Sequence, residues 1–362
     1  MTFHNVDEIT PFNFPLDLSQ FETGAFVKIH DIDISEKHPI SPVVCFILGV
    51  SEMRNVLLRC LILFPLCAVC TPSFSGDAAF GPIITSDNLE KILENDKPLI
   101  LDIRGNNVKD GYIPGAISVN YSAFRGPKNN PGQLVTNAHL TSLFQKLGIR
   151  LERPVVVVFQ GRDATDFGAA ARVYWTLKSA GIRKIAILNG GMNDWKSGLK
   201  RAIRSTPSEP EESGIIVTLR DDWLASRADI LAIVDGSADA KLIDARPNDF
   251  YKGKKQHPAA ARPGTLPKSG VFPHTQWFQA GATIHEESKA NKILQAAGFT
   301  SDKKLVSFCN TGHWAATNWF ALSELSGLKG VKLYPESMVG WSNADLPMDN
   351  TPSLWQNFLN KF

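Results

Sequence analysis

Short hydrophobic runs alternate with longer mixed stretches through most of the chain. In the first half, the hydrophobic runs are short and rich in Val, Ile and Leu, which is typical of buried strands: Leu99–Ile103, Val155–Phe159 and Lys184–Leu188. The stretches between them have the composition of helices: Ser86–Glu94, Ala138–Leu147 and Ala169–Ser179, the first with Ser86 or Asp87 as N-cap. This alternation predicts an α/β fold, in which a parallel sheet has helices on both faces.

The second half contains the most distinctive stretch, Lys303–Phe320. Leu305–Phe308 has the pattern of a buried strand, and Ala315–Leu325 is rich enough in Ala, Leu and aromatics to be a helix. The residues between them, 309 to 314, therefore form a tight loop at the carboxyl end of a strand. Ligands of parallel sheets bind at that edge, so we expect a functional site in this loop.

An internal repeat sets the domain organisation. Four pairs of segments correspond between the halves: Pro98–Arg104 with Lys241–Arg246, Gly111–Ala116 with Ala261–Leu266, Val155–Phe159 with Leu305–Phe308, and Gly190–Trp195 with Met338–Trp341. Residues 204–214 are polar, contain two prolines and are typical of an exposed linker. The repeat predicts two tandem domains of one fold, residues 80–203 and 215–362.

The two copies differ at the loop. In this pairing, Gln160 takes the place of Cys309, and Gln cannot act as a nucleophile. If Trp195 and Trp341 correspond, the loop of the first copy is longer by three residues. The chemistry is therefore expected in the second domain.

Cys309 is the candidate nucleophile. A loop that leads from a strand into a helix directs backbone N–H groups inward, and these groups favour the thiolate over the thiol. The alternative is a structural cysteine, because free cysteines are often buried. Phosphatase chemistry is disfavoured, since it needs an arginine six residues later to bind the phosphate and that position is Ala315.

This loop and its surroundings resemble the active site of the rhodanese family of sulfurtransferases. The match extends to Lys241–Gly253, which is similar to the family's D-x-R strand end, and to Ala261–Pro273, which is similar to its H-I-P-G-A segment. Val331–Asp349 resembles the segment that closes such a domain. The first copy then resembles the cysteine-free domain of the tandem members, which is structural or forms one wall of the cleft.

The resemblance implies a double displacement. The Cys309 thiolate attacks the sulfane sulfur of a donor such as thiosulfate, and a thiophilic acceptor, cyanide or a thiol, then takes that sulfur from the persulfide. The resemblance assigns the cradle of the persulfide to the loop: Asn310, Thr311, Gly312, His313 and Trp314. No metal or organic cofactor is implied. The neutral Asn310 and Thr311 also keep 3-mercaptopyruvate open as donor.

Two other functions remain open for a protein with this cysteine: a sulfur-relay or thiol-sensing protein that turns over slowly, and a binding module without catalysis.

The other candidate residues each have two possible roles. Arg246 either binds an anionic donor or braces the loop through Asp244. His313 either orients or deprotonates an acceptor or only hydrogen-bonds the loop, and packing is favoured for Trp314. The lysines at 252, 254 and 255 either steer an anion or form a solvated face. The histidines at 257, 274 and 285 show no metal-ligand spacing.

The net charge of +2 gives no reason to expect a nucleic acid or membrane surface as partner, so we expect small-molecule partners and a monomer. Residues 53–75 have the form of a signal peptide, which predicts a periplasmic or otherwise exported protein. Residues 1–52 show no sustained period, and we interpret them as a non-native or disordered extension before a start at Met53. Cleavage leaves Cys309 as the only one of five cysteines.

Overall fold

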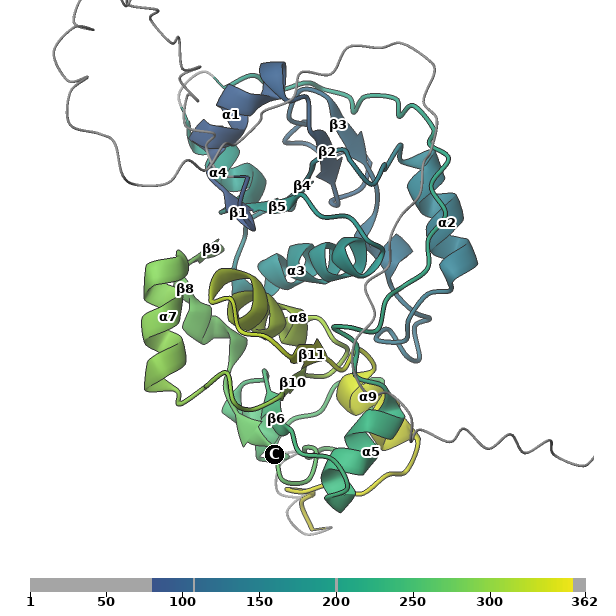
Figure 1. Cartoon of the computed structure of the whole chain (residues 1–362), viewed down its shortest axis with the longest axis vertical. Coiled ribbons are helices and arrows are strands. Elements are labelled where there is room, and N and C mark those ends of the chain that lie inside the picture. The colour runs from purple at the N-terminus through teal and green to yellow at the C-terminus, as the bar shows by residue number, and fades with distance from the viewer. Residues whose placement is uncertain (1–79, 107, 199–200, 354–362) are drawn as a thin grey trace, which may run out of the picture. The chain divides into compact units, whose positions relative to one another are not determined.

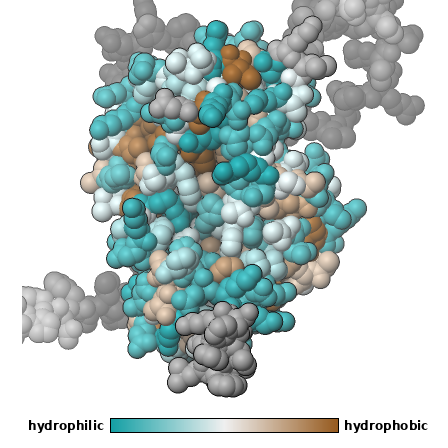
Figure 2. All heavy atoms as spheres, turned by 180° about the vertical axis from the view of Figure 1, so that it is seen from behind, coloured by the Kyte–Doolittle hydropathy of each residue, from teal (hydrophilic) through white to brown (hydrophobic). Residues whose placement is uncertain are grey.

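The computed structural model describes residues 80–106, 108–198 and 201–353, which all belong to one compact unit (Figure 1). The predicted extension, 1–52, and the predicted signal peptide, 53–75, lie outside the described residues. Among the helices that are described, none is long and apolar enough to cross a membrane. On the face drawn in Figure 2, hydrophilic residues prevail and hydrophobic ones are scattered among them.

The first domain contains a parallel five-stranded sheet in the order β1-β5-β4-β2-β3. Its strands are β1 (Ile83–Ile84), β2 (Leu99–Asp102), β3 (Ala116–Ser118), β4 (Val155–Val158) and β5 (Ile185–Leu188). Its helices are α1 (Ser86–Asn95), η1 (Tyr121–Phe124), α2 (Asn137–Lys146), α3 (Ala164–Ser179) and α4 (Gly191–Ser197). β2, β4 and β5 are buried along their whole length, because helices cover both faces of the sheet.

The second domain contains a parallel four-stranded sheet in the order β11-β10-β6-β7. Its strands are β6 (Lys241–Asp244), β7 (Gly270–Val271), β10 (Leu305–Phe308) and β11 (Val331–Leu333), and an antiparallel pair, β8 (Phe278–Ala280) and β9 (Thr283–Ile284), lies outside the sheet. Its helices are α5 (Arg227–Asp235), α6 (Asn248–Tyr251), η2 (His274–Trp277), α7 (Glu287–Ala296), α8 (Trp314–Phe320), η3 (Ala321–Leu325) and α9 (Ser337–Asn343). The predicted α/β class with two tandem parallel sheets is confirmed.

The inner faces of both sheets share one hydrophobic core. α3 and α8 pack against each other where the domains meet (Figure 1), and Phe167 lies between Phe278 and Phe320 at ring-centroid distances of 5.3 and 5.6 Å. A separate core under α1 and α4 closes the outer face of the first sheet, and another under α5 and α9 closes that of the second. The shared core fixes the first domain against the carboxyl end of β10.

Local capping explains where two helices begin. α1 begins after Thr85, whose hydroxyl accepts the Asn88 amide at 3.3 Å, so the predicted cap at Ser86 or Asp87 is wrong by one or two residues. α3 begins five residues before the predicted Ala169, because the Asp163 carboxylate caps it by accepting the Asp166 amide at 2.8 Å.

The strand register corrects the pairing of the repeats. Asp102 lies opposite Val158, and Asp244 lies opposite Phe308, so Val158 corresponds to Phe308. Phe159, not Gln160, therefore occupies the position of Cys309. The amides of Met192 and Met338 confirm this, because they donate to the carbonyls of Phe159 and Cys309 at 2.8 and 3.0 Å.

The predicted longer loop in the first domain is also wrong. Five residues follow the strand in each copy, 159–163 and 309–313, and the additional residues lie in α3, which has 16 residues where α8 and η3 have 7 and 5. The paired tryptophans do correspond. Trp195 and Trp341 are both fully buried, each four residues after the start of its helix.

A second pairing shifts by three residues. The Arg104 Nη2 donates to the carbonyl of Gly111, and the Arg246 Nη2 to that of Gly264, so these two glycines correspond. The segment predicted to match Gly111–Ala116 therefore begins at Gly264, not at Ala261. Lys268 then stands at the position of Gly115 and keeps its left-handed backbone, with φ of 61° against 79°.

The predicted linker is largely exposed and runs along the first domain. Arg204 pairs with Tyr112 through both backbone hydrogen bonds, and the Ser213 amide donates to Gln145 at 3.0 Å. The chain then follows α2, where the Val217 amide donates to the Thr141 hydroxyl at 3.0 Å. Residues at the start of the predicted second domain thus pack on the first.

Candidate active site

Cys309 follows β10 and is the only free thiol among the described residues. It lies at the carboxyl edge of the second sheet, as the sequence predicts, in a loop that ends where α8 begins. Only 1% of its surface is exposed, and it belongs to the core shared by the domains. The loop therefore holds its nucleophile under the first domain instead of on an open surface.

Ser337 anchors this loop from the start of α9. Its hydroxyl oxygen accepts the amides of Cys309 and Gly312 at 3.0 and 3.1 Å and donates its proton to the Tyr334 carbonyl at 2.8 Å. Ser337 is fully buried and has a φ of 50°, a region that non-glycine residues rarely adopt. One strained serine thus fixes both ends of the cysteine loop.

The remaining loop amides are free for an anion. Within the described residues, the amides of Asn310, Thr311, His313 and Trp314 have no acceptor at hydrogen-bonding distance. Successive N–H groups at a strand-to-helix turn form an anion-binding concavity. The loop can therefore hold a negatively charged sulfur.

The corresponding loop of the first domain is filled by its own side chain. The amides of Gly161 and Arg162 donate to one carboxylate oxygen of Asp166 at 2.9 and 3.1 Å, and the Arg162 guanidinium binds the other at 3.0 Å. In the second domain, Ala316 stands where Asp166 does. The two loops have the same length, but the left-handed glycine is the third residue of the first loop, Gly161, and the fourth of the second, Gly312. Among the described contacts, the loops differ in what accepts the third amide: that of Gly161 donates to Asp166, whereas that of Thr311 has no acceptor.

Arg246 braces the loop. Its guanidinium is 1% exposed, binds the buried Asp244 through both carboxylate oxygens, with the shortest contact at 2.7 Å, and donates to the Asn310 side-chain oxygen at 3.2 Å. Of the two predicted roles, these contacts are those of bracing, because every nitrogen of the guanidinium has a protein partner. Binding of an anionic donor by Arg246 stays a prediction. Arg104 repeats the arrangement with Asp102 and Gln160.

The other predicted loop residues contact the first domain through their backbone. The Thr311 carbonyl accepts the Arg125 Nη2 at 2.8 Å, and the Gly312 carbonyl accepts the Arg172 Nη1 at 3.3 Å. Gly312 has a φ of 68°, and a Cβ there would lie 2.4 Å from the Arg172 Nη1, so this position requires glycine. Asn310 and Thr311 are buried beside Cys309.

His313 points away from the loop into the first domain. Its Nε2 donates to the Thr165 carbonyl at 2.7 Å, which leaves Nδ1 to accept the Tyr121 hydroxyl at 3.0 Å. Burial, and next the charge of Arg125, lower the pKa of His313 to about 4. Both ring nitrogens bind the first domain and neither binds the loop. A role of His313 in orienting or deprotonating an acceptor stays a prediction.

Trp314 packs, as favoured from the sequence. It stacks on His274 at 4.8 Å between ring centroids and meets Phe250 edge-on at 5.9 Å. His274 donates from Nδ1 to the Ala245 carbonyl, and burial lowers its pKa to about 4. The lysines at 252, 254 and 255 are exposed, as a solvated face would be. Among the residues that the structure describes, no cluster of His, Cys, Asp and Glu could hold a metal ion.

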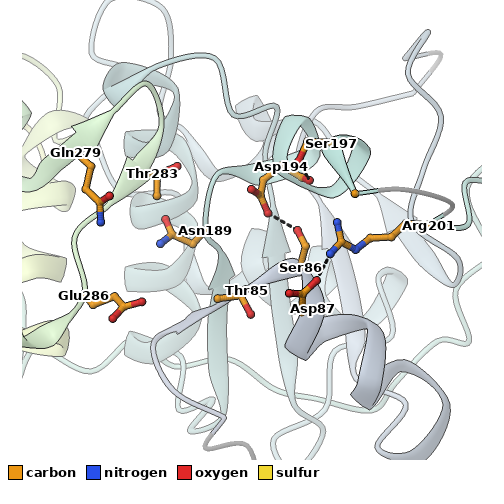
Figure 3. Close-up of a pocket in the computed structure, with 11 residues that line it drawn as sticks. Thr85, Ser86, Asp87, Asn189, Asp194, Ser197, Arg201, Gln279, Thr283 and Glu286 are labelled. Carbon is orange, nitrogen blue, oxygen red and sulfur yellow. Dashed lines mark hydrogen bonds and ion pairs between the residues drawn. The ribbon is translucent and has the colours of Figure 1, made fainter.

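Two pockets lie away from Cys309. One, of about 380 Å³, lies between the first domain and the β8–β9 pair (Figure 3). Two of its carboxylates have partners within the pocket: Asp194 accepts the Ser86 hydroxyl at 2.5 Å, and Asp87 binds Arg201. The other, of about 300 Å³, lies at Gln160, Arg162 and Asp166, in front of the filled loop. Neither pocket contains a nucleophilic thiol.

Sequence reasoning missed four residues of this site: Tyr121, Arg125, Arg172 and Ser337. Ser337 corresponds to Gly191 of the first copy, and the repeat could have drawn attention to that difference. The other three come from the first domain and reach the loop across the interface, which no local pattern in the sequence indicates.

The fold and the site define a tandem α/β protein in which the one cysteine of the described residues lies at the end of a parallel strand. The family model of the rhodanese-like domain matches residues 85–198 and 226–344, and the chain therefore belongs to the rhodanese family.

Two relatives bear the name thiosulfate sulfurtransferase. One, from Azotobacter vinelandii, is 29% identical over 275 residues, which cover 75% of this chain and 98% of the relative. The other, from Pseudomonas aeruginosa, is 30% identical over 242 residues, covering 66% and 86%. The crystal structure of the Escherichia coli 3-mercaptopyruvate sulfotransferase SseA shares the fold, with a TM-score of 0.59 and 22% identity over 70% of this chain and 97% of that one.

Proposed function

We propose that this chain is a sulfurtransferase that moves a sulfane sulfur from thiosulfate to cyanide or a thiol through a persulfide on Cys309. The observation that carries the proposal is the contrast between the two loops. In the first domain, the Asp166 carboxylate occupies the loop and accepts two of its amides, whereas in the second domain Ala316 stands at that position and no carboxylate occupies the loop beside the cysteine. Backbone N–H groups at a strand-to-helix turn that no carboxylate occupies are suited to bind a sulfur anion.

The proposed step is a displacement at sulfur. The Cys309 thiolate forms a bond to the outer sulfur of thiosulfate while the bond between the two thiosulfate sulfurs breaks, and sulfite leaves with that electron pair. The persulfide carries the single negative charge that the thiolate had. The acceptor then attacks the outer sulfur, and the thiolate is restored. The chain's free amides hold the anion at both stages.

Thiosulfate is favoured as donor by the names of the two relatives and by the two arginines beside the loop. 3-Mercaptopyruvate is the second candidate, because Asn310 and Thr311 are neutral and small, and it would use the same persulfide. The burial of Cys309 supports a third interpretation, a slow sulfur relay, since only 1% of the residue is exposed to a donor in this structure.

The test is intact-mass analysis of the protein after incubation with each donor, beside Cys309→Ser. We expect thiosulfate to add the mass of one sulfur atom, and cyanide to remove it, only in the protein that has Cys309. Uptake of sulfur from 3-mercaptopyruvate but not from thiosulfate would make 3-mercaptopyruvate the donor. Uptake of sulfur without repeated turnover would favour the slow sulfur relay. No uptake from either donor would overturn the proposal.

Export remains a separate proposal, and it rests on residues 53–75. Sequencing the N-terminus of the protein secreted by its own cells should find a start soon after Ser75. A mature chain that begins at Met1 would contradict it. We also keep the monomer as a proposal, for which size-exclusion chromatography with light scattering is the measurement.

A further inference from the structure

Arg172 is a buried cation without an acidic partner. It projects from α3 of the first domain, is 1% exposed, and forms no ion pair with any described carboxylate. Its Nη1 and Nη2 donate to the carbonyls of Gly312 and Gly132, both at 3.3 Å, and its Nε has no partner. Two long bonds to neutral oxygens compensate a buried guanidinium poorly.

Arg125 adds a second guanidinium at the same loop. Its Nη2 donates to the Thr311 carbonyl at 2.8 Å, and its buried Nη1 has no partner. It too has no ion pair among the described residues, and it lies over the Tyr121 ring at 5.3 Å. The two arginines therefore hold consecutive carbonyls of the loop that begins at Cys309, and each keeps an N–H group unsatisfied.

The other buried arginines show what is missing. Arg104 and Arg246 each bind an aspartate through both carboxylate oxygens, at 2.6 and 2.7 Å for the shorter contacts. Burial, and next the charge of Arg125, lower the pKa of Arg172 to about 9, while the negative forms of Tyr121 and Cys309 act in the opposite direction. The anion that would complete this pair of cations is one on Cys309.

We propose that Arg125 and Arg172, both from the domain without a cysteine, supply the counter-charge for the sulfur anion on Cys309, first the thiolate and then the persulfide. This inference rests on the proposed function for the persulfide, but not for the thiolate. The first domain is then an electrostatic part of the active site and not only a wall. With one thiolate against two guanidiniums, a net positive charge remains to attract an anionic donor.

The test compares alkylation of Cys309 by iodoacetate, which is anionic, and iodoacetamide, which is neutral. Both reagents react with the thiolate, so the ratio of their rates cancels differences in ionisation and exposure and reports the local charge. We expect Arg172→Gln and Arg125→Gln each to lower this ratio by roughly tenfold, the effect of about 1.4 kcal/mol of charge interaction. Arg172→Lys and Arg125→Lys should retain most of it.

Arg153→Gln is the matched control. Arg153 is also in the first domain and donates to two backbone carbonyls, those of Lys97 and Pro98, but it precedes β4 and so lies at the opposite edge of the sheet. We expect it to leave the ratio unchanged. Near-ultraviolet circular dichroism of each variant shows whether it is folded, and Arg125→Gln, at a partly exposed position, provides the test if Arg172→Gln is not.

An unchanged ratio in folded Arg125→Gln and Arg172→Gln would overturn the inference, whether or not both reagents react more slowly, because the ratio reports the charge at the sulfur. The outcome is independent of sulfur transfer, because alkylation needs no donor. A protein that shows the charge effect but takes up no sulfur would keep the counter-charge and reject the proposed function. Sulfur uptake without the charge effect would keep the proposed function and reject the counter-charge.

Discussion

Phe159 and Cys309 occupy the same backbone position in the two domains, each following a central strand and each accepting the amide of a buried methionine through its carbonyl. The phenyl ring packs against Phe167 at 5.6 Å, whereas the thiol lies beneath the interface. The residue after the central strand is thus a phenylalanine that packs in the core in one domain and the candidate catalytic cysteine in the other.

Because the Asp166 carboxylate fills the first loop, a thiol alone should not restore chemistry there. We expect Phe159→Cys in a Cys309→Ser background to take up no sulfur from thiosulfate, measured by intact mass. The exchange removes a large buried side chain, with a cost of about 3 kcal/mol, so folding is checked first. Sulfur on the introduced thiol would show that the Asp166 carboxylate does not keep an anion out of the first loop.

Ser337 gives a prediction in which glycine is the milder replacement. Ser337→Ala leaves the amides of Cys309 and Gly312 without their acceptor and should lower the free energy of unfolding by about 1–3 kcal/mol. Ser337→Gly loses the same bonds but relieves the left-handed backbone, so it should be more stable than the alanine variant by about 1 kcal/mol. Urea denaturation measures both, and the opposite order would contradict this account of the strain.

The buried His274 and the half-buried His313 predict how the free energy of unfolding depends on pH. Burial lowers the pKa of His313 and His274 from the ordinary 6.5 to about 4, so between these values the unfolded chain binds more protons than the folded one. Stability should therefore fall as the pH is lowered from 6.5 towards 4, by at most about 1.4 kcal/mol per pH unit for each histidine. Denaturation at pH 7 and 5 should show a shallower slope for His313→Gln, and an unchanged slope would contradict the neutral state of His313.

A comparison of Arg246 with Arg104 distinguishes a loss of folding stability from a loss of support for the cysteine loop. Arg246→Gln and Arg104→Gln each leave a fully buried aspartate unpaired, which should cost about 3–5 kcal/mol in the free energy of unfolding. Only the first releases the Asn310 side chain beside Cys309. We expect slower sulfur uptake for Arg246→Gln alone, among variants that remain folded. Equal uptake by both would remove Arg246 from the loop's support.

Local patterns predicted much of this molecule. The strand Leu305–Phe308 is found at its predicted bounds, and the loop after it holds the cysteine, because a buried run that ends in a glycine-containing turn is defined by its own residues. The register of the first copy was not predictable in the same way. Val155–Phe159 is hydrophobic throughout, so nothing within it shows that the strand ends at Val158 and that Phe159 belongs to the loop.

The site residues that were missed depend on contacts across the chain. Tyr121, Arg125 and Arg172 lie more than a hundred residues from Cys309 in the sequence, and each resembles an ordinary surface or helix residue there. For Arg246, the sequence identified the residue but not its role. An arginine two residues after an aspartate at a strand end fits both binding of a donor and bracing of the loop. The bracing becomes visible only in the buried bond to Asn310.

The two arginines of the first domain, Arg125 and Arg172, bind the cysteine loop through the carbonyl oxygens of Thr311 and Gly312. A carbonyl is present whatever the side chain, so exchanging Thr311 for another residue of similar size leaves the Arg125 contact in place. At position 311, the residue can therefore change towards another sulfur donor without loss of this bond between the domains. Gly312 and His313 have no such freedom, because a Cβ at 312 would meet Arg172 and the His313 ring itself binds the first domain.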